Sequence, residues 1–168
     1  MPVKAILALG SNLGSSEDTL IRAIADICAH EKIAVTNISP IAITAPVGGP
    51  AGQPDYTNMV VEIETSLSPF TLLAYTQAIE TKHHRTREVR WGPRTLDIDI
   101  IDIANLEMDD PDLTLPHPRA AERAFVLEPW ARMDPSALLL GHSVRQLADD
   151  AADAGGIREF HPAPVVCV

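Results

Sequence analysis

The sequence predicts an α+β protein whose elements follow the order β-α-β-β-α-β. Four apolar runs have the length and β-branched content of strands, at residues 3–10, 32–44, 56–65 and 95–103. Two segments instead repeat their apolar residues at helical spacing, 16–28 and 69–80. This order is that of the ferredoxin-like sandwich, an antiparallel sheet with the two helices packed on one face. The length suits one domain over residues 1–168, with a C-terminal helical region after the last strand.

The first half of the chain supplies a strand, a helix and a β-rich segment. Residues 3–10, VKAILALG, form a short apolar run that ends in Gly, as expected of a buried strand. Ser15 or Ser16 caps the following helix, and acidic residues occupy its first turn. Pro40 cannot donate to a sheet hydrogen bond, so we expect residues 32–44 to form an edge strand or to contain a bulge.

The second half alternates loops with the remaining elements. Residues 45–55 hold three Gly and three Pro and predict a long loop, of a size that is usually functional or mobile. Ser68 and Pro69 begin the second helix, and the basic segment that follows it is expected as a loop. Beyond the last strand we expect a charged connection at 105–116, a helical region at 118–133 interrupted at Pro129, a short helix at 143–154 and a tail without assignment after about 155.

The composition predicts a cytoplasmic protein. No apolar run approaches the ~18 residues of a membrane span, and the apolar stretch near the start is about six residues long, short for a signal peptide. Cys28 and Cys167 lie far apart and outside any metal-binding spacing, so we expect no disulfide framework and no zinc site. Cys28 is expected as a buried, inert thiol on the first helix.

Charge is distributed unevenly along this acidic chain. A net charge of −10 argues against nucleic acid or anionic lipid as a partner, because both require neutralisation of phosphates by Lys and Arg. Five of the 13 basic residues nevertheless fall within one stretch of thirteen positions: Lys82, Arg85, Arg87, Arg90 and Arg94. The chain therefore concentrates positive charge immediately before its last predicted strand.

Two aspartates stand in that strand. Residues two apart in a strand point to the same face, so Asp97 and Asp99 project together while Ile98 and Ile100 face the opposite layer. At ~6.5 Å and an effective dielectric near 20, the two carboxylates repel by on the order of 2 to 3 kcal/mol. A bound Mg²⁺ ion would offset this repulsion, because Mg²⁺ coordinates a few carboxylate oxygens together with water and phosphate oxygens. The spacing of the two carboxylates also suits two ions.

A bare Asp-x-Asp more often lies on a solvated sheet face. Here four arginines lie just upstream, and each planar guanidinium can donate two parallel hydrogen bonds to phosphate oxygens. The arginines and aspartates together indicate a site for a metal-bound triphosphate.

Four motifs make the sequence resemble one family. RWGPRTLDIDI at 90–100, GSNLG at 10–14, QPDYTN at 53–58 and LTLPHPRAAERAFVLEP at 113–129 are similar to segments of 6-hydroxymethyl-7,8-dihydropterin pyrophosphokinase, over about residues 5–135. The resemblance implies transfer of the diphosphate of ATP to the pterin hydroxymethyl group, with release of AMP, in folate biosynthesis. It also implies a ferredoxin-like fold and two Mg²⁺ ions. We further expect a monomer with ATP and the pterin as its small-molecule substrates.

The resemblance also implies roles for individual residues. Asp97 and Asp99 would hold both Mg²⁺ ions, and Arg85 and Arg94 would stabilise charge on the moving diphosphate. The implied ATP-binding residues are Gln77, Glu80, Arg87, Arg90, Trp91, Ile100, Thr114, His117 and Arg123. The implied pterin-binding residues are Thr44, Ala45, Val47, Tyr56, Asn58 and Phe125, with the Tyr56 and Phe125 rings stacking on the two sides of the pterin.

Plainer interpretations stand beside several of these roles. His117 is equally typical of a surface or capping histidine, Phe125 of a core residue and Asn58 of a strand-end turn bond, while Gln77 and Glu80 fit a solvated helix face. Another Asp-x-Asp enzyme, such as a nucleotidyl- or glycosyltransferase, leaves QPDYTN and ERAF unexplained. A ferredoxin-like RNA-binding module conflicts with the acidity and lacks the aromatic strand motif of such modules.

Overall fold

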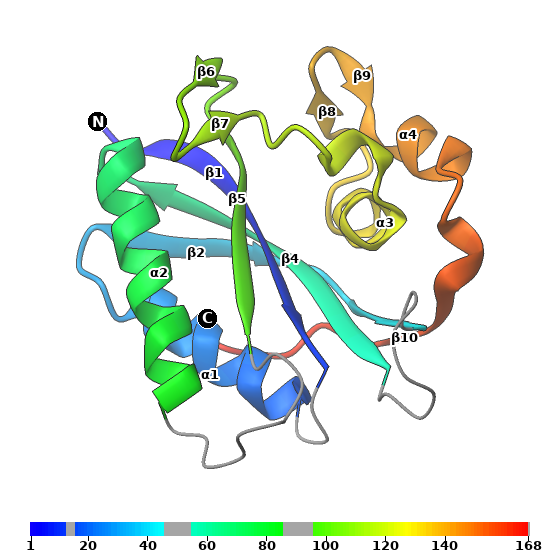
Figure 1. The fold of residues 1–168 in the computed structure, drawn as a ribbon, viewed down its shortest axis with the longest axis horizontal. Coiled ribbons are helices and arrows are strands. Elements are labelled where there is room, and N and C mark those ends of the chain that lie inside the picture. Colours follow the sequence, from blue (N-terminus) through cyan, green and yellow to red (C-terminus); the bar gives the residue numbers. More distant parts are fainter. Residues whose placement is uncertain (13–15, 46–54, 86–95, 168) are drawn as a thin grey trace.

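A six-stranded antiparallel sheet with helices on both faces forms the protein (Figure 1). The computed structural model describes residues 1–12, 16–45, 55–85 and 96–167. The helices are α1 (Ser16–Cys28), α2 (Pro69–Arg85), α3 (Ala124–Met133) and α4 (Val144–Asp150). The strands are β1 (Val3–Ser11), β2 (Ile33–Ile38), β3 (Ile41–Thr44), β4 (Tyr56–Thr65), β5 (Asp97–Ile103), β6 (Met108–Asp109), β7 (Thr114–Leu115), β8 (Leu138–Leu139), β9 (His142–Ser143) and β10 (Ile157–His161).

The sheet has the strand order β10-β3-β4-β1-β5, and β2 also pairs with β4. Every described pair in it is antiparallel, which confirms the predicted α+β class. The register places Gly10 of β1 opposite Asn58 of β4 on one side and Asp97 of β5 on the other. One end of the sheet therefore brings residues from three separate motifs side by side.

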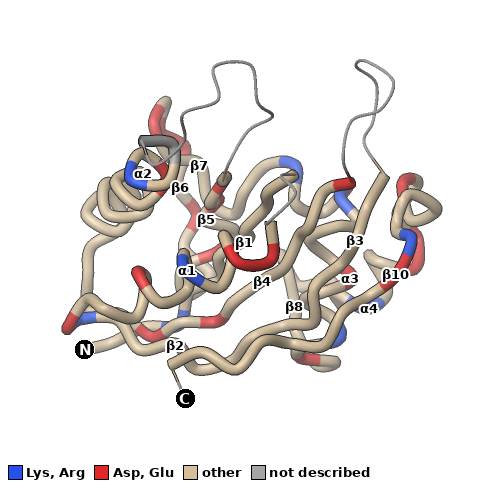
Figure 2. The backbone as a smooth tube through the Cα atoms, turned by 90° about the horizontal axis from the view of Figure 1, so that it is seen from below, with Lys and Arg blue, Asp and Glu red and all other residues tan. Residues whose placement is uncertain are grey.

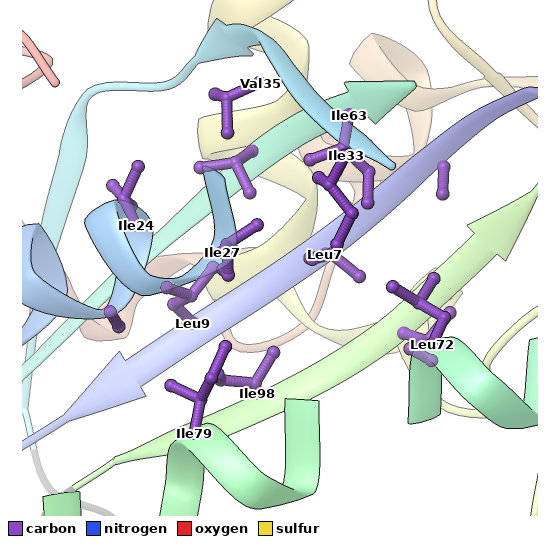
Figure 3. Close-up of a cluster of buried hydrophobic side chains, with 14 of the residues drawn as sticks. Leu7, Leu9, Ile24, Ile27, Ile33, Val35, Ile63, Leu72, Ile79 and Ile98 are labelled. Carbon is purple, nitrogen blue, oxygen red and sulfur yellow. The ribbon is translucent and has the colours of Figure 1, made fainter. Parts of the chain in front are cut away.

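Alternation along the strands divides the apolar residues between two cores. Leu7 and Leu9 of β1 pack with α1 and α2, as Figure 3 shows for Ile24, Ile27 and Ile79. Ile6 and Ala8, which alternate with these leucines along β1, face α3 and α4 instead. The prediction placed both sheet-packing helices on one face. α1 and α2 do lie on one face, and the C-terminal helices cover the other (Figure 1).

The sequence predicted a backbone irregularity at each of two prolines. The structure shows the one at Pro40 but not the one at Pro129. Pro40 lies in the gap between β2 and β3, which both pair with β4, so the 32–44 segment is broken where its backbone donor is missing. Pro129 was expected to interrupt a helix, but α3 runs through it. The break falls earlier, at Arg123, which separates a 3₁₀ turn at Ala120–Glu122 from α3.

Two further segments differ from expectation. The basic segment was predicted as a loop from residue 82, but α2 continues to Arg85; residues 86–94 of that segment lie outside the described residues. The unassigned tail contains β10, which pairs with β3. Its weak alternation gave no strand signal, because β10 is an edge strand with both faces partly exposed.

A disulfide joins α1 to the C-terminal tail, contrary to prediction. Cys28 and Cys167 are bonded, with Cα atoms 6.5 Å apart and a sequence separation of 139. Figure 1 shows the C-terminus beside α1, and the neighbouring Val166 packs against the core that α1 helps to form. The sequence could not indicate this pairing, because it depends on the path by which the tail returns to α1.

We expect Cys167→Ser to lower the free energy of unfolding by about 2 kcal/mol, since the crosslink restricts the unfolded chain. Urea denaturation with and without reductant measures this change. The Ser variant serves as the control, because reductant should leave its curve unchanged. Identical wild-type curves in the two conditions would show that the crosslink contributes nothing.

A histidine attaches β10 to α1. His161 forms a hydrogen bond through Nδ1 with Glu17 Oε1, and its Nε2 lies 3.4 Å from Glu159 Oε1. The hydrogen bond to Glu17, with further help from both negative charges, raises the pKa of His161 above its ordinary 6.5. The folded state thus binds the proton more tightly than the unfolded chain. The contact stabilises the fold below about pH 6.5 and is lost as pH rises through the raised pKa.

His161→Gln should therefore lower stability more at about pH 5.5 than at about pH 8.5. The effect should stay below about 1 kcal/mol, because both side chains are 40% exposed. Urea midpoints of both proteins at the two pH values provide the measurement. A larger loss at the higher pH would contradict the assigned direction of the pKa shift.

Charged residues of both signs are spread along the described part of the chain (Figure 2). Figure 2 shows Lys and Arg scattered among Asp and Glu along the described backbone. No described helix is both long enough and apolar enough to cross a bilayer.

Candidate active site

A cavity of about 550 Å³ opens between the end of the sheet and the start of α3. Its walls come from β1, β3, β4, β5, the residues around the start of α3, and the segment just before and at the start of β10. Its lining residues are Ala8, Leu9, Gly10, Thr44, Ala45, Tyr56, Asn58, Met59, Asp97, Asp99, Arg123, Phe125, Asp153, Gly156 and Ile157. The cavity therefore contains both predicted metal ligands and most of the residues implied for the pterin.

Alternation in β5 places the two carboxylates as predicted. Asp97 and Asp99 are half-buried and line the cavity, while Ile98 and Ile100 are buried in the core on the opposite face. Asp99 lies opposite Ala8 of β1, whose small side chain leaves room in front of the carboxylate. One side of a single strand thus presents two oxygen-rich groups to one cavity.

The outer edge of β5 is held by groups from outside the sheet. Glu80 Oε2 of α2 accepts a hydrogen bond of 2.8 Å from the Ile98 backbone N–H, between the two aspartates. Further along, the His117 backbone N–H donates to the Ile101 carbonyl at 2.8 Å. Glu80 is therefore engaged with β5 rather than only solvated on its helix. These two contacts fix the strand that carries the carboxylates.

The donor set at β5 fits magnesium bound jointly by protein and substrate. Within the described ranges, no group of three or more His, Cys, Asp or Glu side chains is placed to hold a metal ion. Two carboxylates alone make a poor site for a metal that requires four protein ligands. They suit Mg²⁺, which commonly uses one or two carboxylates and completes its octahedron with water and phosphate oxygens.

Asn58 occupies the other end of the cavity. It is 8% exposed, and its Nδ2 donates to Thr44 Oγ1 across the β3–β4 pair at 3.0 Å. This contact joins two strands and is not the turn bond considered above. Gly10 lies beside it, and a Cβ atom at Gly10 would stand 2.7 Å from Asn58 Oδ1. The amide is thus confined between Thr44 and the bare backbone of Gly10.

Aromatic side chains from two elements border the same space. Tyr56 at the start of β4 and Phe125 in the first turn of α3 are both half-buried and line the cavity. Phe125 also packs against the α3–α4 core, so its side chain contacts both this core and the cavity. The Arg123 guanidinium carbon lies 5.5 Å from the centre of the Phe125 ring, a cation–π contact. A flat apolar ligand has ring surfaces available here.

His117 lies near Asp99 without lining the cavity. Its Nδ1 accepts a hydrogen bond of 3.2 Å from the Arg119 backbone N–H, so it caps a turn. Burial lowers the pKa of His117 below its ordinary 6.5, and the charges of Arg123 and Arg119 add to this, although Asp99 acts in the opposite direction. The imidazole is therefore neutral at pH 7.

The remaining predicted residues fall into two groups. Gln77 is exposed on α2, Ile100 is buried on the far face of β5, and Thr114 donates to the Asp110 carbonyl at 3.3 Å; none of them lines the cavity. The predictions for Val47, Arg87, Arg90, Trp91 and Arg94 lie outside the described residues, as does the side chain of Arg85.

Sequence reasoning missed several residues of the cavity. Gly10 belongs to a quoted motif and ends an apolar run, and this position was a signal that a backbone approaches closely there. Asp153, Gly156 and Ile157 had no comparable signal, because they follow a short helix in a segment without a motif.

Comparisons with known proteins show which family the sequence matches. Residues 6–135 match the model of the 7,8-dihydro-6-hydroxymethylpterin-pyrophosphokinase (HPPK) family. A 2-amino-4-hydroxy-6-hydroxymethyldihydropteridine pyrophosphokinase of Bacillus subtilis is 49% identical over 129 residues, 77% of each chain. The protein of the same name from Pseudomonas aeruginosa is 39% identical over 132 residues, 79% of this chain and 81% of that one.

Solved structures show the same fold at much lower identity. The crystal structure of Plasmodium falciparum HPPK-DHPS with pterin and p-hydroxybenzoate aligns with a TM-score of 0.68 and 14% identity. The alignment covers 89% of this chain and 43% of the Plasmodium chain, so the likeness concerns less than half of that protein. The match to the family model and the two bacterial relatives establish that the chain belongs to the 7,8-dihydro-6-hydroxymethylpterin-pyrophosphokinase family, whose members are transferases of folate synthesis.

Proposed function

We propose that the protein transfers the diphosphate of ATP to the hydroxymethyl group of 6-hydroxymethyl-7,8-dihydropterin through the cavity at the end of its sheet. The products are the pterin diphosphate and AMP. The observation that carries the proposal is the presence, in one cavity, of the Asp97–Asp99 pair and the Asn58, Tyr56 and Phe125 side chains. The first set suits a metal-bound polyphosphate, and the second suits a flat heterocycle. We propose that the enzyme acts as a cytoplasmic monomer.

The pterin would occupy the end of the cavity nearest β3 and β4. Asn58 can donate and accept hydrogen bonds, which matches the mixed edge of a pterin ring. Thr44 holds the amide in place through its hydroxyl group. The rings of Tyr56 and Phe125 provide stacking surfaces, each contributing ~0.5 to 1.5 kcal/mol beyond the burial of area. Backbone groups of Thr44 and Ala45 complete the contacts at this edge.

The triphosphate of ATP would lie against β5. Asp97 and Asp99 would hold two Mg²⁺ ions, which when bound neutralise phosphate charge and orient the reacting oxygens. Arg123 lines the cavity and carries a permanent positive charge for phosphate oxygens. His117, neutral at pH 7, can donate one hydrogen bond from Nε2 because its Nδ1 already accepts one. We also retain Gln77, Glu80, Ile100 and Thr114 as proposed nucleotide contacts, with Arg85, Arg87, Arg90, Trp91 and Arg94.

The proposed diphosphate transfer depends more on the correct placement of the two substrates than on a reactive side chain of the protein. In phosphoryl-type transfers, catalysis consists mainly of bringing the two oxygens into line with phosphorus and stabilising charge. The cavity serves this need, because Gly10 faces Asn58 on one neighbouring strand and Asp97 on the other. The pterin hydroxyl would therefore be held on the side of the metal-bound phosphates, with Arg85 and Arg94 proposed to stabilise the moving diphosphate.

Incubation of the protein with ATP, Mg²⁺ and the hydroxymethyl dihydropterin tests the proposal. Chromatography should reveal AMP that forms only when the pterin is present. ADP as the nucleotide product would indicate a monophosphate transfer instead. Inorganic diphosphate released together with a nucleotidylated pterin would indicate a nucleotidyltransferase, and either result would refute the proposed reaction.

A further inference from the structure

Residues 153–157 connect two walls of the cavity that are distant in sequence. They follow α4, form a 3₁₀ turn at Ala154–Gly156 and lead into β10. They also lie beyond residues 6–135, which match the family model. Asp153, Gly156 and Ile157 nevertheless line the same cavity as Asp97 and Asn58.

One end of this segment is joined to β3. Ile157 pairs with Thr44, and the Ala45 backbone N–H donates to the Gly156 carbonyl at 2.9 Å. These contacts hold the last described residues before the Gly/Pro-rich loop. Because Thr44 Oγ1 accepts from Asn58, the segment is two contacts away from the amide proposed to read the pterin edge.

The other end is joined to the start of α3. Asp153 Oδ1 accepts a hydrogen bond of 2.9 Å from the Ala124 backbone N–H. Arg123, at the N-cap position of α3, makes no capping bond with its own side chain. The carboxylate of Asp153 thus supplies from a remote part of the chain an acceptor that Ser, Thr, Asp or Asn usually provides at a helix N-cap. Its negative charge also suits the positive end of the helix dipole.

We propose that Asp153 is a positioning residue for the pterin, acting through the Ala124 backbone N–H on the two residues that flank Ala124. Those residues are Arg123 and Phe125, which both line the cavity and contact each other. A bond at the peptide between them sets the direction in which the chain enters α3. Since that direction places the Phe125 ring, the carboxylate determines how well the ring meets a flat ligand. This inference rests on the proposed function, because it assumes the pterin as the ligand.

Asp153→Ala should raise the KM for the pterin about five- to tenfold, because the start of α3 then lacks the acceptor that orients Phe125. We expect kcat to change by less than about twofold, because Asp153 is not proposed to act in the transition state. Asp153→Asn should restore most of the wild-type KM, since its amide oxygen can accept the same hydrogen bond. The Kd of 6-hydroxymethylpterin, measured by calorimetry without ATP, should change in parallel with KM.

Asp150→Ala provides a matched control. Asp150 lies at the end of α4, accepts hydrogen bonds from Gln146 Nε2 and does not line the cavity. Its removal should leave both KM and the pterin Kd unchanged. If Asp153→Ala does not fold, as judged by circular dichroism, Asp153→Thr takes its place, because its hydroxyl group is one bond too short for the same contact.

The outcomes separate this inference from the proposed function. A wild-type protein that makes no AMP rejects the proposed function, whereas the calorimetric comparison of the variants still reports on Asp153. An active wild type, with Asp153→Ala equal to Asp150→Ala, overturns the positioning role alone. That role is also overturned if Asp153→Asn loses as much pterin affinity as Asp153→Ala, or if the variants lower kcat at an unchanged KM.

Discussion

Replacement of Asp97 or Asp99 by Asn should reduce AMP formation at least about 1,000-fold, equivalent to about 4 kcal/mol of transition-state stabilisation. Asn keeps the size of the side chain and one oxygen but removes the negative charge that Mg²⁺ requires. Both residues are half-buried on one face of β5, whose backbone is held by Glu80 and by the turn at His117. The loss should therefore come from the missing charge and not from displacement of the strand.

Binding measurements distinguish this loss from general damage. The Kd of 6-hydroxymethylpterin without ATP should stay close to that of the wild type, because the pterin contacts lie on β3, β4 and α3. Asp102→Asn is the matched control on the same strand. Asp102 does not line the cavity, so this substitution should leave AMP formation near the wild-type rate. Normal turnover by the double variant at Asp97 and Asp99 would refute the metal-binding role.

Gly10→Ala should raise the KM for the pterin about 100-fold, or about 2.7 kcal/mol. The new Cβ atom would stand 2.7 Å from Asn58 Oδ1, closer than carbon and oxygen can approach. Asn58 must then shift, and we expect this shift to break its hydrogen bond to Thr44 and to displace the amide from the cavity. A buried amide that loses its partner carries a further cost of about 1 to 3 kcal/mol.

Gly155→Ala is the control for this change. A Cβ atom at Gly155 would meet nothing within 4 Å, so stability and KM should both remain near the wild-type values. Steady-state kinetics with the pterin as varied substrate, at saturating ATP, gives the comparison. An unchanged KM in Gly10→Ala would show that Asn58 does not read the pterin edge.

The fold was predictable where apolar periodicity is strong. The segments that form β1, β4 and β5 could be recognised as strands, because each contributes many apolar residues to a buried core. β10 was not recognised, since its position beside β3 depends on contacts with α1 and on the path of the tail. The disulfide between Cys28 and Cys167 was missed for the same reason.

The site was predictable where a motif places chemistry on a regular element. The period of two in β5 was enough to place Asp97 and Asp99 together on one face, and the structure confirms this geometry. Asp153 could not be found in this way, because it reaches Ala124 across 29 positions of sequence. A side chain that acts through a remote backbone N–H leaves no local pattern for sequence reasoning to detect.

The most direct test of the account is the fate of the β-phosphate of ATP. ATP labelled at the β-phosphorus should be incubated with the protein, Mg²⁺ and 6-hydroxymethyl-7,8-dihydropterin, and the products separated by chromatography. We predict that the label moves to the pterin diphosphate, with one AMP formed for each labelled pterin. Label that remains in ADP, or that appears in free diphosphate, would contradict the proposed diphosphate transfer.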